Sequence, residues 1–322
     1  MELIPISQTS LNVSGLCLGL ASLGIKNNTE ASGFELMDRF VELGGNFFDT
    51  ARVYSNWIPG ERNRSERIFG DWLEARGIRD QLVIATKGGH RIQGNPTFRT
   101  TPKDISKDLT GSLETLRIEQ IDLYYLHRDD PSVPVGEIID YLNTEIESGK
   151  IRYLGCSNWT SERIRAANEY AETHNKHGFV ASQPRWSLGS RHAEKPSDPT
   201  LLSLDQSDYD FHKQSGMAVI PYSSQAGGFF SKFANDGISE TLKKSSLFNS
   251  KNLAIAESLK ALSNDLDVDI AHLVLAFMTS RPFPVIPIVG CRTSDQIKDS
   301  VNGLDLSLDE DQQRTIHSLD PY

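Results

Sequence analysis

Four side chains suited to proton transfer follow apolar runs in the first half of the chain. Asp49 ends the run NFFD, Lys87 ends LVIATK, His127 ends IDLYYLH, and Tyr54 comes five residues after Asp49. Taken singly, such an aspartate is more often a helix cap, and such a lysine or histidine is more often a solvated or internally satisfied group. Their succession along the chain makes a shared site the stronger interpretation.

The chemistry of such a site follows from the pKa values of its members. A tyrosine hydroxyl, with an ordinary pKa near ~10, is a poor acid or base at neutral pH unless it is helped. A lysine ammonium within ~4–6 Å favours the phenolate, so Lys87 should lower the Tyr54 pKa, while Asp49 keeps the lysine charged. His127 can then orient a substrate oxygen. The set predicts proton exchange with a carbonyl or alcohol oxygen, together with a hydride partner that side chains do not supply.

For these residues to meet, their apolar runs must be parallel strands. Short apolar runs recur along the chain, and a helix-patterned segment follows most of them, as is typical of βα units. Eight runs are predicted strands: 15–20, 46–49, 82–86, 121–126, 153–156, 179–182, 218–221 and 285–289. The glycines after the first run do not fit the GxGxxG of a doubly wound dinucleotide fold. We therefore predict one (β/α)8 TIM barrel over residues 1–322, with the strand C-termini sharing one functional face.

Two further features belong to this predicted barrel. Residues 3–6 and 11–13 are predicted to pair as an N-terminal β-hairpin that closes its bottom. Three stretches after strand ends, 91–101, 188–205 and 225–249, show no regular pattern and are predicted to be long loops on the C-terminal face. Loops of such length in a compact domain are usually functional or disordered.

The bulk properties exclude several classes of protein. The net charge is −10 with both signs mixed throughout, which argues against general nucleic-acid binding. Three scattered cysteines indicate a reducing compartment, and the longest apolar run is too short to span a bilayer. We expect a soluble cytoplasmic protein with a small-molecule substrate and no membrane or nucleic-acid partner. Its state as a monomer or homo-oligomer is undetermined by the sequence.

Two rival enzyme classes also place polar residues at barrel strand ends. A metal-dependent hydrolase needs an HxH motif and several further ligands, but the eight histidines are dispersed and only His127 ends a predicted strand. We therefore predict no metal site. A glycoside hydrolase needs two facing carboxylates, where this chain offers His127 after the fourth run and Tyr222-Ser223 after the seventh.

Along nearly its whole length the chain resembles the aldo-keto reductase superfamily. The motifs that carry the resemblance are DTARVY (49–54), ATKGG (85–89), IDLYYLHR (121–128), GKIRYLGCSNW (149–159), SQPRWSL (182–188), PYSS (221–224) and PIVGCRTSDQI (287–297). The resemblance implies that Asp49, Tyr54, Lys87 and His127 form a catalytic tetrad. It further implies reduction of an aldehyde or ketone with NADPH, or with NADH as the alternative.

The resemblance also implies a set of cofactor-binding residues. Ser157, Asn158 and Gln183 match the groups that bind the nicotinamide carboxamide, and Trp186 stands where the family often has a stacking tyrosine. The remaining matches are Tyr222 and Ser223, and, in the segment that holds the adenosine half, Gly290, Arg292, Gln296 and Ser300. Arg292 would bind a 2′-phosphate. Gln296 stands where many members have another arginine, and Asp299-Ser300 replaces a common Glu-Asn pair.

Polar side chains near the tetrad favour a polar substrate. Trp57, His90 and Arg128 are predicted to form the substrate wall, and buried polar groups reject ligands that leave them unpaired. The expected substrate is therefore a small polar aldehyde or ketone, possibly a sugar. One alternative remains open on the sequence, namely a cofactor-binding regulatory or interaction subunit that retains the tetrad but turns over slowly.

Overall fold

Eight parallel strands form the centre of the molecule in this computed structural model, which describes residues 1–23, 29–91, 97–189, 198 and 200–320. They are β3 (Cys17–Gly19), β4 (Phe47–Asp49), β5 (Val83–Gly88), β6 (Ile121–Leu126), β7 (Ile151–Ser157), β8 (Phe179–Gln183), β9 (Ala218–Val219) and β10 (Ile288–Val289). From β3 to β9 each strand pairs with the next in chain order, and β10 pairs with β3. A parallel bridge between Val219 and Val285 closes the ring. All eight predicted strands are present, so the predicted (β/α)8 barrel is confirmed.

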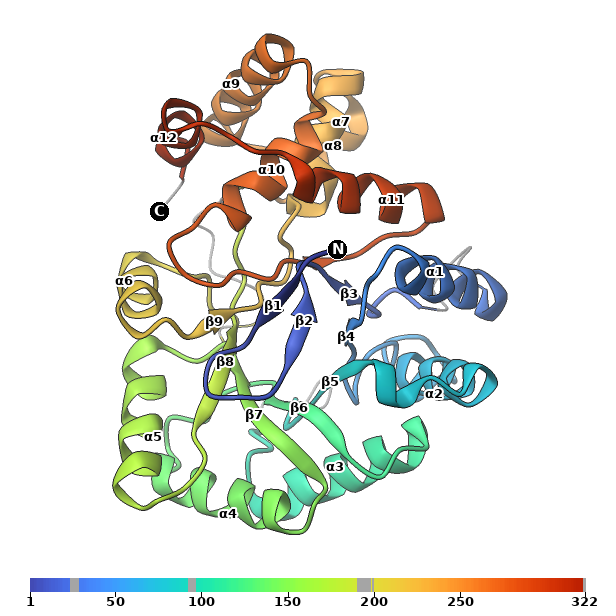
Figure 1. Ribbon diagram of the computed structural model, residues 1–322, viewed down its shortest axis with the longest axis vertical. Coiled ribbons are helices and arrows are strands. Elements are labelled where there is room, and N and C mark those ends of the chain that lie inside the picture. Colours follow the sequence, from blue (N-terminus) through green and yellow to red (C-terminus); the bar gives the residue numbers. More distant parts are fainter. Residues whose placement is uncertain (24–28, 92–96, 190–197, 199, 321–322) are drawn as a thin grey trace.

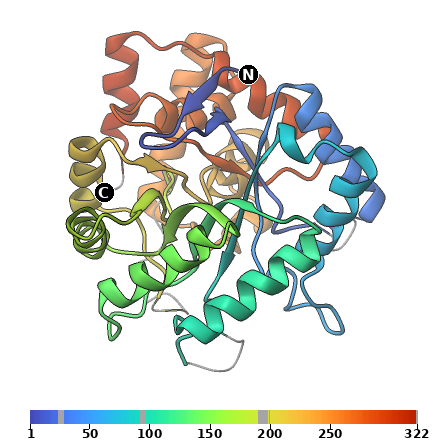
Figure 2. The same ribbon diagram turned by 60° about the horizontal axis from the view of Figure 1, so that its bottom comes forward.

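Helices surround the strands (Figures 1 and 2). The outer layer follows the chain through α1 (Glu30–Glu42), α2 (Arg64–Arg76), α3 (Pro102–Leu116), α4 (Val135–Glu147), α5 (Ser161–Thr173) and α6 (Gln206–Ser215). The later helices are α7 (Phe229–Asp236), α8 (Glu240–Lys243), α9 (Ser250–Leu266), α10 (Ile270–Thr279), α11 (Ser294–Asn302) and α12 (Glu310–Ser318). Short 3-10 segments lie at Arg79–Gln81, Ala226–Gly228 and Gly303–Asp305. Figure 1 shows α7, α8, α9 and α12 gathered at one end of the molecule's long axis.

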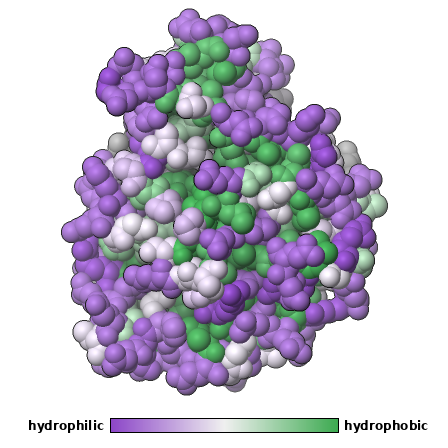
Figure 3. All heavy atoms as spheres, in the orientation of Figure 1, coloured by the Kyte–Doolittle hydropathy of each residue, from purple (hydrophilic) through white to green (hydrophobic). Residues whose placement is uncertain are grey.

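The N-terminal hairpin covers the bottom of the barrel as predicted. β1 (Leu3–Pro5) pairs antiparallel with β2 (Asn12–Ser14). Val13 is buried in one cluster with Phe47 and Val83, the first residues of β4 and β5. Figure 3 shows this face, which is hydrophilic at its rim and more hydrophobic towards its middle, where the hairpin lies. The hairpin thus seals the end of the barrel opposite the strand C-termini.

The adjacent phenylalanines of β4 explain why this strand is apolar on both faces. Phe47 packs with the hairpin inside the barrel, while Phe48 packs outward against Phe69 and Trp72 of α2. Both side chains are fully buried. Because successive side chains of a strand point to opposite faces, a strand covered on both sides has no polar alternation. β4 is therefore held rigidly up to its last residue, Asp49.

The prediction that residues 225–249 are irregular is wrong. This stretch contains α7 and α8, and Phe229, Phe230 and Phe233 of α7 are buried against Phe277 of α10. The helices are only eight and four residues long, so neither shows enough repeats for a clear period in the sequence. The other two predicted loops extend into residues 92–96, 190–197 and 199, which lie outside the described residues.

Two predictions from composition can be compared with the structure. Cys17, Cys156 and Cys291 are free, buried thiols. Among the helices of the described ranges, none is both long and apolar enough to cross a membrane.

The buried imidazole of His212 on α6 should make stability fall with acid. Its Nδ1 lies 3.0 Å from the Met217 carbonyl oxygen, and burial lowers the pKa of His212 from 6.5 to about 4. Between these two values the unfolded chain binds a proton that the folded chain excludes, so stability is complete above the unfolded pKa and is lost as pH falls. His212→Asn should remove about 2 kcal/mol of the loss between about pH 7 and about pH 5. Urea unfolding of both proteins at the two pH values measures this, and equal losses would contradict it.

Candidate active site

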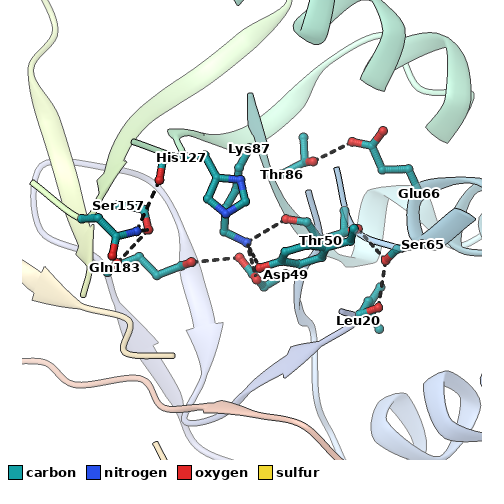
Figure 4. Close-up of polar contacts among 12 residues, drawn as sticks. Leu20, Asp49, Thr50, Ser65, Glu66, Thr86, Lys87, His127, Ser157 and Gln183 are labelled. Carbon is teal, nitrogen blue, oxygen red and sulfur yellow. Dashed lines mark hydrogen bonds and ion pairs between the residues drawn. The ribbon is translucent and has the colours of Figure 1, made fainter. Parts of the chain in front are cut away.

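Lys87 lies at the centre of a buried hydrogen-bond cluster (Figure 4). It sits near the end of β5, and its fully buried Nζ donates to Asp49 Oδ2 at 2.6 Å, to the Thr50 carbonyl oxygen at 2.8 Å and to Tyr54 Oη at 2.9 Å. An ammonium group has three protons, so all of its donors are used. Because Tyr54 Oη accepts from Lys87, its own proton remains available for another oxygen.

The turn that carries Tyr54 is fixed to the neighbouring strand. The Thr50 and Arg52 amides donate to the carbonyl oxygens of Ala85 and Lys87 at 2.9 and 3.0 Å. The Arg52 side chain also donates to Glu66 on α2 at 3.2 Å. These bonds hold the turn against β5, so the tyrosine ring is positioned over the lysine, whose Nζ is 4.5 Å from the ring centre.

Glu66 is a supporting residue that sequence reasoning missed. Its carboxylate is fully buried and accepts hydrogen bonds from Thr86 Oγ1 at 2.7 Å and from Arg52. Burial raises the pKa of Glu66, while the hydrogen bond from Thr86 and the charge of Arg52 act against the rise. One sequence signal could have found it, because Glu66 stands on the same stripe of α2 as Phe69 and Trp72, where a carboxylate needs a buried partner.

The pKa values of the cluster keep Tyr54 protonated. Burial raises the pKa of Tyr54, and the nearby Lys87 ammonium only partly offsets this effect. The prediction that Lys87 would bring the net pKa below the ordinary value is therefore wrong, because desolvation of the phenolate is the larger effect. For Lys87, burial alone would lower the pKa, but Asp49 and then Tyr54 outweigh it and the pKa is raised. The lysine stays charged and the tyrosine stays a proton donor.

His127 follows β6 directly and faces the same space. Its amide donates to the Gly88 carbonyl oxygen at 2.9 Å, and its ring centre lies 5.8 Å from that of Tyr54 in an edge-to-face arrangement. Burial holds the pKa of His127 well below 6.5, with the His90, Arg128 and Lys87 charges adding to the effect. The imidazole is therefore neutral at pH 7. Its buried Nδ1 has no hydrogen-bond partner among the described residues.

The next two strands add an amide and hydroxyl chain beside the tetrad. Gln183 ends β8 and donates from Nε2 to Asp49 Oδ1 at 2.9 Å. Ser157 ends β7 and donates to the Gln183 carbonyl oxygen at 2.8 Å, while Asn158 Nδ2 donates to Ser157 Oγ at 3.0 Å. Asn158 has a φ of 59°, which turns the chain sharply after the strand. All three predicted residues line the cavity that also contains Asp49, Tyr54 and His127.

The structure does not bring Trp186 to this cavity. Its side chain is fully buried with Phe277 and Phe283, at ring-centre distances of 5.9 and 6.3 Å, and the Arg281 guanidinium lies 5.4 Å from its ring. Tyr222 lines the cavity instead, and its hydroxyl donates to Asn158 Oδ1 at 2.8 Å. The aromatic surface available beside Asn158 is therefore Tyr222, and the predicted stacking role of Trp186 is corrected accordingly.

The cavity extends from the tetrad to the C-terminal part of the chain and has a volume of about 1970 Å³. That volume exceeds the ~300–1,000 Å³ typical of small-molecule pockets. Its far end is lined by the predicted residues Ser223, Gly290, Arg292, Gln296 and Ser300. Gln296 Oε1 accepts from the Arg292 amide at 2.8 Å, and Gln225 Nε2 donates to Ser300 Oγ at 3.2 Å. A cavity of this size, lined by residues from both halves of the chain, suits a ligand with two separated recognition groups.

The segment that begins at Ser223 also lines the cavity and has an unusual backbone. Ser223, Ala226, Gly227 and Gly228 all have positive φ values, and α7 begins directly after them without a side-chain cap. Backbone N–H groups at an uncapped helix start attract anions. This segment therefore fits a phosphate group.

Trp57, His90 and Arg128 lie around the tetrad end of the cavity, as predicted. Trp57 is 49% exposed at the rim, and the His90 ring lies 4.6 Å from the His127 ring. Arg128 is buried directly after His127. Of the described residues, no group of three or more His, Cys, Asp or Glu side chains is placed to hold a metal ion.

A buried Lys87–Asp49 pair, the half-buried Tyr54 and a neutral histidine lie together at the C-terminal end of a parallel barrel. The model of the Aldo/keto reductase family matches residues 15–321, and the chain therefore belongs to this family of oxidoreductases.

Characterised and uncharacterised relatives agree with this membership. The chain is 30% identical to the uncharacterized oxidoreductase YrpG of Bacillus subtilis, over 100% of this chain and 96% of that protein. It is 30% identical to the norsolorinic acid reductase stcV of Emericella nidulans, covering 97% and 79% of the two chains. It is 28% identical to an aryl-alcohol dehydrogenase [NADP(+)] of Phanerodontia chrysosporium, covering 97% and 84%.

Proposed function

We propose that this protein reduces an aldehyde or ketone to an alcohol with NADPH, and that Tyr54 gives the proton to the carbonyl oxygen. The observation that carries the proposal is the Lys87 Nζ to Tyr54 Oη hydrogen bond of 2.9 Å inside a fully buried Lys87–Asp49 pair. It fixes the tyrosine as an acceptor towards the lysine and a donor towards the cavity. A bound nicotinamide would supply the hydride for the carbonyl carbon, which no side chain can do.

The chain's own residues divide the remaining work. As the carbonyl oxygen gains negative charge, Tyr54 Oη transfers its proton to it, and the Lys87 charge stabilises the phenolate that is left. Neutral His127 orients the carbonyl oxygen without competing as an acid. Asp49 keeps Lys87 charged and in place.

The residues along the cavity are suited to a dinucleotide. Ser157, Asn158 and Gln183 would bind the carboxamide, with Tyr222 as the aromatic neighbour. Ser223 and the uncapped start of α7 would hold the pyrophosphate, and Gly290, Gln296 and Ser300 would lie along the adenosine. The exposed Arg292 has no carboxylate partner among the described residues, which leaves its guanidinium for a 2′-phosphate.

The wall near the tetrad supports a polar substrate. Trp57, His90 and Arg128 combine an aromatic face with two polar groups, which suits a small polar carbonyl compound such as a sugar. The free cysteines fit a reducing compartment, which supports a cytoplasmic location.

The first test measures the oxidation of NADPH and of NADH in the presence of a panel of aromatic, aliphatic and sugar aldehydes and ketones. The loss of nicotinamide absorbance reports the reaction. Turnover with at least one carbonyl is expected. Tight cofactor binding with no turnover on any of them would instead favour a cofactor-binding regulatory subunit, and failure to bind either cofactor would contradict both functions.

Replacing Arg292 with alanine should weaken the use of NADPH and leave NADH use nearly unchanged. One lost charge-assisted contact corresponds to roughly a tenfold rise in the KM for NADPH. Lys298→Ala is the matched control, because Lys298 is an exposed cation on α11, the helix that begins just after Arg292, and it lies outside the cavity lining. Equal KM changes for the two cofactors would show that Arg292 does not read the 2′-phosphate.

A further inference from the structure

We propose that the substrate carries an anionic group, a carboxylate or a phosphate, and that Arg128 binds it. This inference rests on the proposed carbonyl reductase activity and narrows its substrate class. It depends on an arginine that is buried in the wall of the cavity beside the tetrad, with part of its hydrogen-bonding capacity unused.

Arg128 is held in place by its own backbone neighbour. It directly follows His127, and its Nη1 donates to the His127 carbonyl oxygen at 2.7 Å. The side chain is only 7% exposed, yet it lines the cavity. Nη2 reaches Asp198 Oδ2 at 3.4 Å, a long contact for an ion pair. Nε is buried and has no hydrogen-bond partner among the residues that the structure describes.

The free edge of Arg128 is the one that binds oxyanions best. A guanidinium binds a planar or tetrahedral oxyanion through two parallel N–H groups, commonly Nε and one Nη. Here Nε is unused and Nη2 has one weak contact. A neutral ligand without acceptors would leave the buried Nε–H unpaired, which carries a penalty. An anionic oxygen pair would satisfy both donors and could displace Asp198 from its long contact.

Two other carboxylates in this region, Asp108 and Asp129, are already paired more closely. Arg99 donates to Asp108 at 2.8 and 3.0 Å, and Arg163 donates to Asp129 at 2.9 and 3.0 Å. Neither acid is therefore left to neutralise Arg128. The lysine charge of the tetrad is matched by Asp49 at 2.6 Å.

The two neighbouring histidines add no positive charge. Burial, followed by the Arg128 charge, lowers the pKa of His90, and burial lowers that of His127, so both rings are neutral at pH 7. His90 Nδ1 lies 2.6 Å from the Arg91 carbonyl oxygen and must carry the proton there. Arg128 therefore provides the net positive charge next to the residue that orients the carbonyl.

The test compares substrates that differ only in charge. One pair is 4-carboxybenzaldehyde and its methyl ester, methyl 4-formylbenzoate; the other is glyceraldehyde 3-phosphate and glyceraldehyde. We expect kcat/KM to favour the anionic member of at least one pair by about tenfold or more, mainly through KM. A preference in the first pair alone identifies a carboxylate, and a preference in the second alone identifies a phosphate.

The variants Arg128→Met and Arg128→Lys connect that preference to the guanidinium. Arg128→Met should bring the anionic-to-neutral ratio close to one, and Arg128→Lys should retain an intermediate ratio because it keeps the charge without the planar fork. The ratio is insensitive to a general loss of activity, since both members of a pair share the same reaction. Arg314→Met, which removes an exposed cation from α12, should leave the ratio unchanged. If Arg128→Met does not fold, the anionic-to-neutral ratio of Arg128→Lys is the deciding measurement.

The experiments distinguish a failure of the proposed anion site from a failure of the proposed reductase activity. If the neutral aldehydes are reduced and the anionic members gain no advantage, or if the ratio survives in Arg128→Met, the anion site is wrong and the reductase proposal stands. If no aldehyde of either pair or of the wider panel is reduced while the cofactor binds, the reductase proposal itself is wrong and the inference falls with it.

Discussion

Tyr54→Phe should lower kcat for carbonyl reduction by about 10²–10⁴-fold while cofactor binding is retained. The change removes the only group of the cluster that has a proton to give to the cavity, because Lys87 already donates all three of its own protons. The phenyl ring can keep its position beside His127 and over Lys87. Steady-state kinetics on any substrate found active, with cofactor titration by fluorescence, measures both quantities.

The pH dependence of the same enzyme gives a second readout. The donor must be protonated, and burial raises the pKa of Tyr54 above its ordinary value of 10.0. The rate of reduction should therefore stay level through neutral and mildly alkaline pH.

Tyr153→Phe is the matched control for Tyr54→Phe, because the Tyr153 hydroxyl contacts Ser10 of the N-terminal hairpin turn and lies outside the cavity lining. A Tyr54→Phe enzyme as active as this control would assign the proton to another group.

Lys87→Met should have the largest effect on stability and should also abolish most activity. The substitution leaves the Asp49 carboxylate, which is 2% exposed, without its charge partner. Removing one partner of a buried ion pair typically costs about 3–5 kcal/mol. The double variant Lys87→Met/Asp49→Asn should recover part of this loss, because no unpaired charge remains. Urea unfolding at neutral pH, followed by tryptophan fluorescence, measures the difference.

The control for this prediction is an exposed pair. Lys243 and Glu240 of α8 form an ion pair at 2.7 Å with both side chains largely in solvent. Lys243→Met should change the free energy of unfolding by less than about 1 kcal/mol. Two results would contradict a stabilising role for the buried Lys87–Asp49 ion pair. One is a Lys87→Met variant that is no less stable than Lys243→Met, and the other is a double variant that is less stable than either Lys87→Met or Asp49→Asn alone.

Much of the fold and of the tetrad could be predicted because topology alone brings strand ends together. Asp49, Lys87 and His127 end or follow consecutive parallel strands, so a barrel forces them to one face whatever the details of packing. Tyr54 follows at a fixed short distance in the chain. For such residues, order and spacing in the sequence are sufficient.

The failures at the candidate site depended on packing that spacing does not encode. The indole of Trp186 turns into a cluster formed by α10 and the loop after it, which a motif at the end of β8 cannot reveal. The sign of the Tyr54 pKa shift depended on the desolvation of the phenol, whose side chain is half-buried in the cavity wall. Gln183 was assigned to the cofactor alone, yet its amide also contacts Asp49. In each case the outcome was decided by side chains distant in sequence.

The uneven lengths of the strands have a mechanical consequence. β5, β6 and β7, at whose ends Lys87, His127 and Ser157 lie, are six or seven residues long, whereas β9 and β10 have two residues each. β9 meets the segment before β10 through the Val219–Val285 bridge. Fewer ladder hydrogen bonds make local opening less costly on that side. The short strands lead into the segments of Tyr222 and Gly290, where the cofactor is proposed to lie. Local opening is therefore expected along this seam, where the proposed cofactor would enter and leave, before it is expected between β5, β6 and β7.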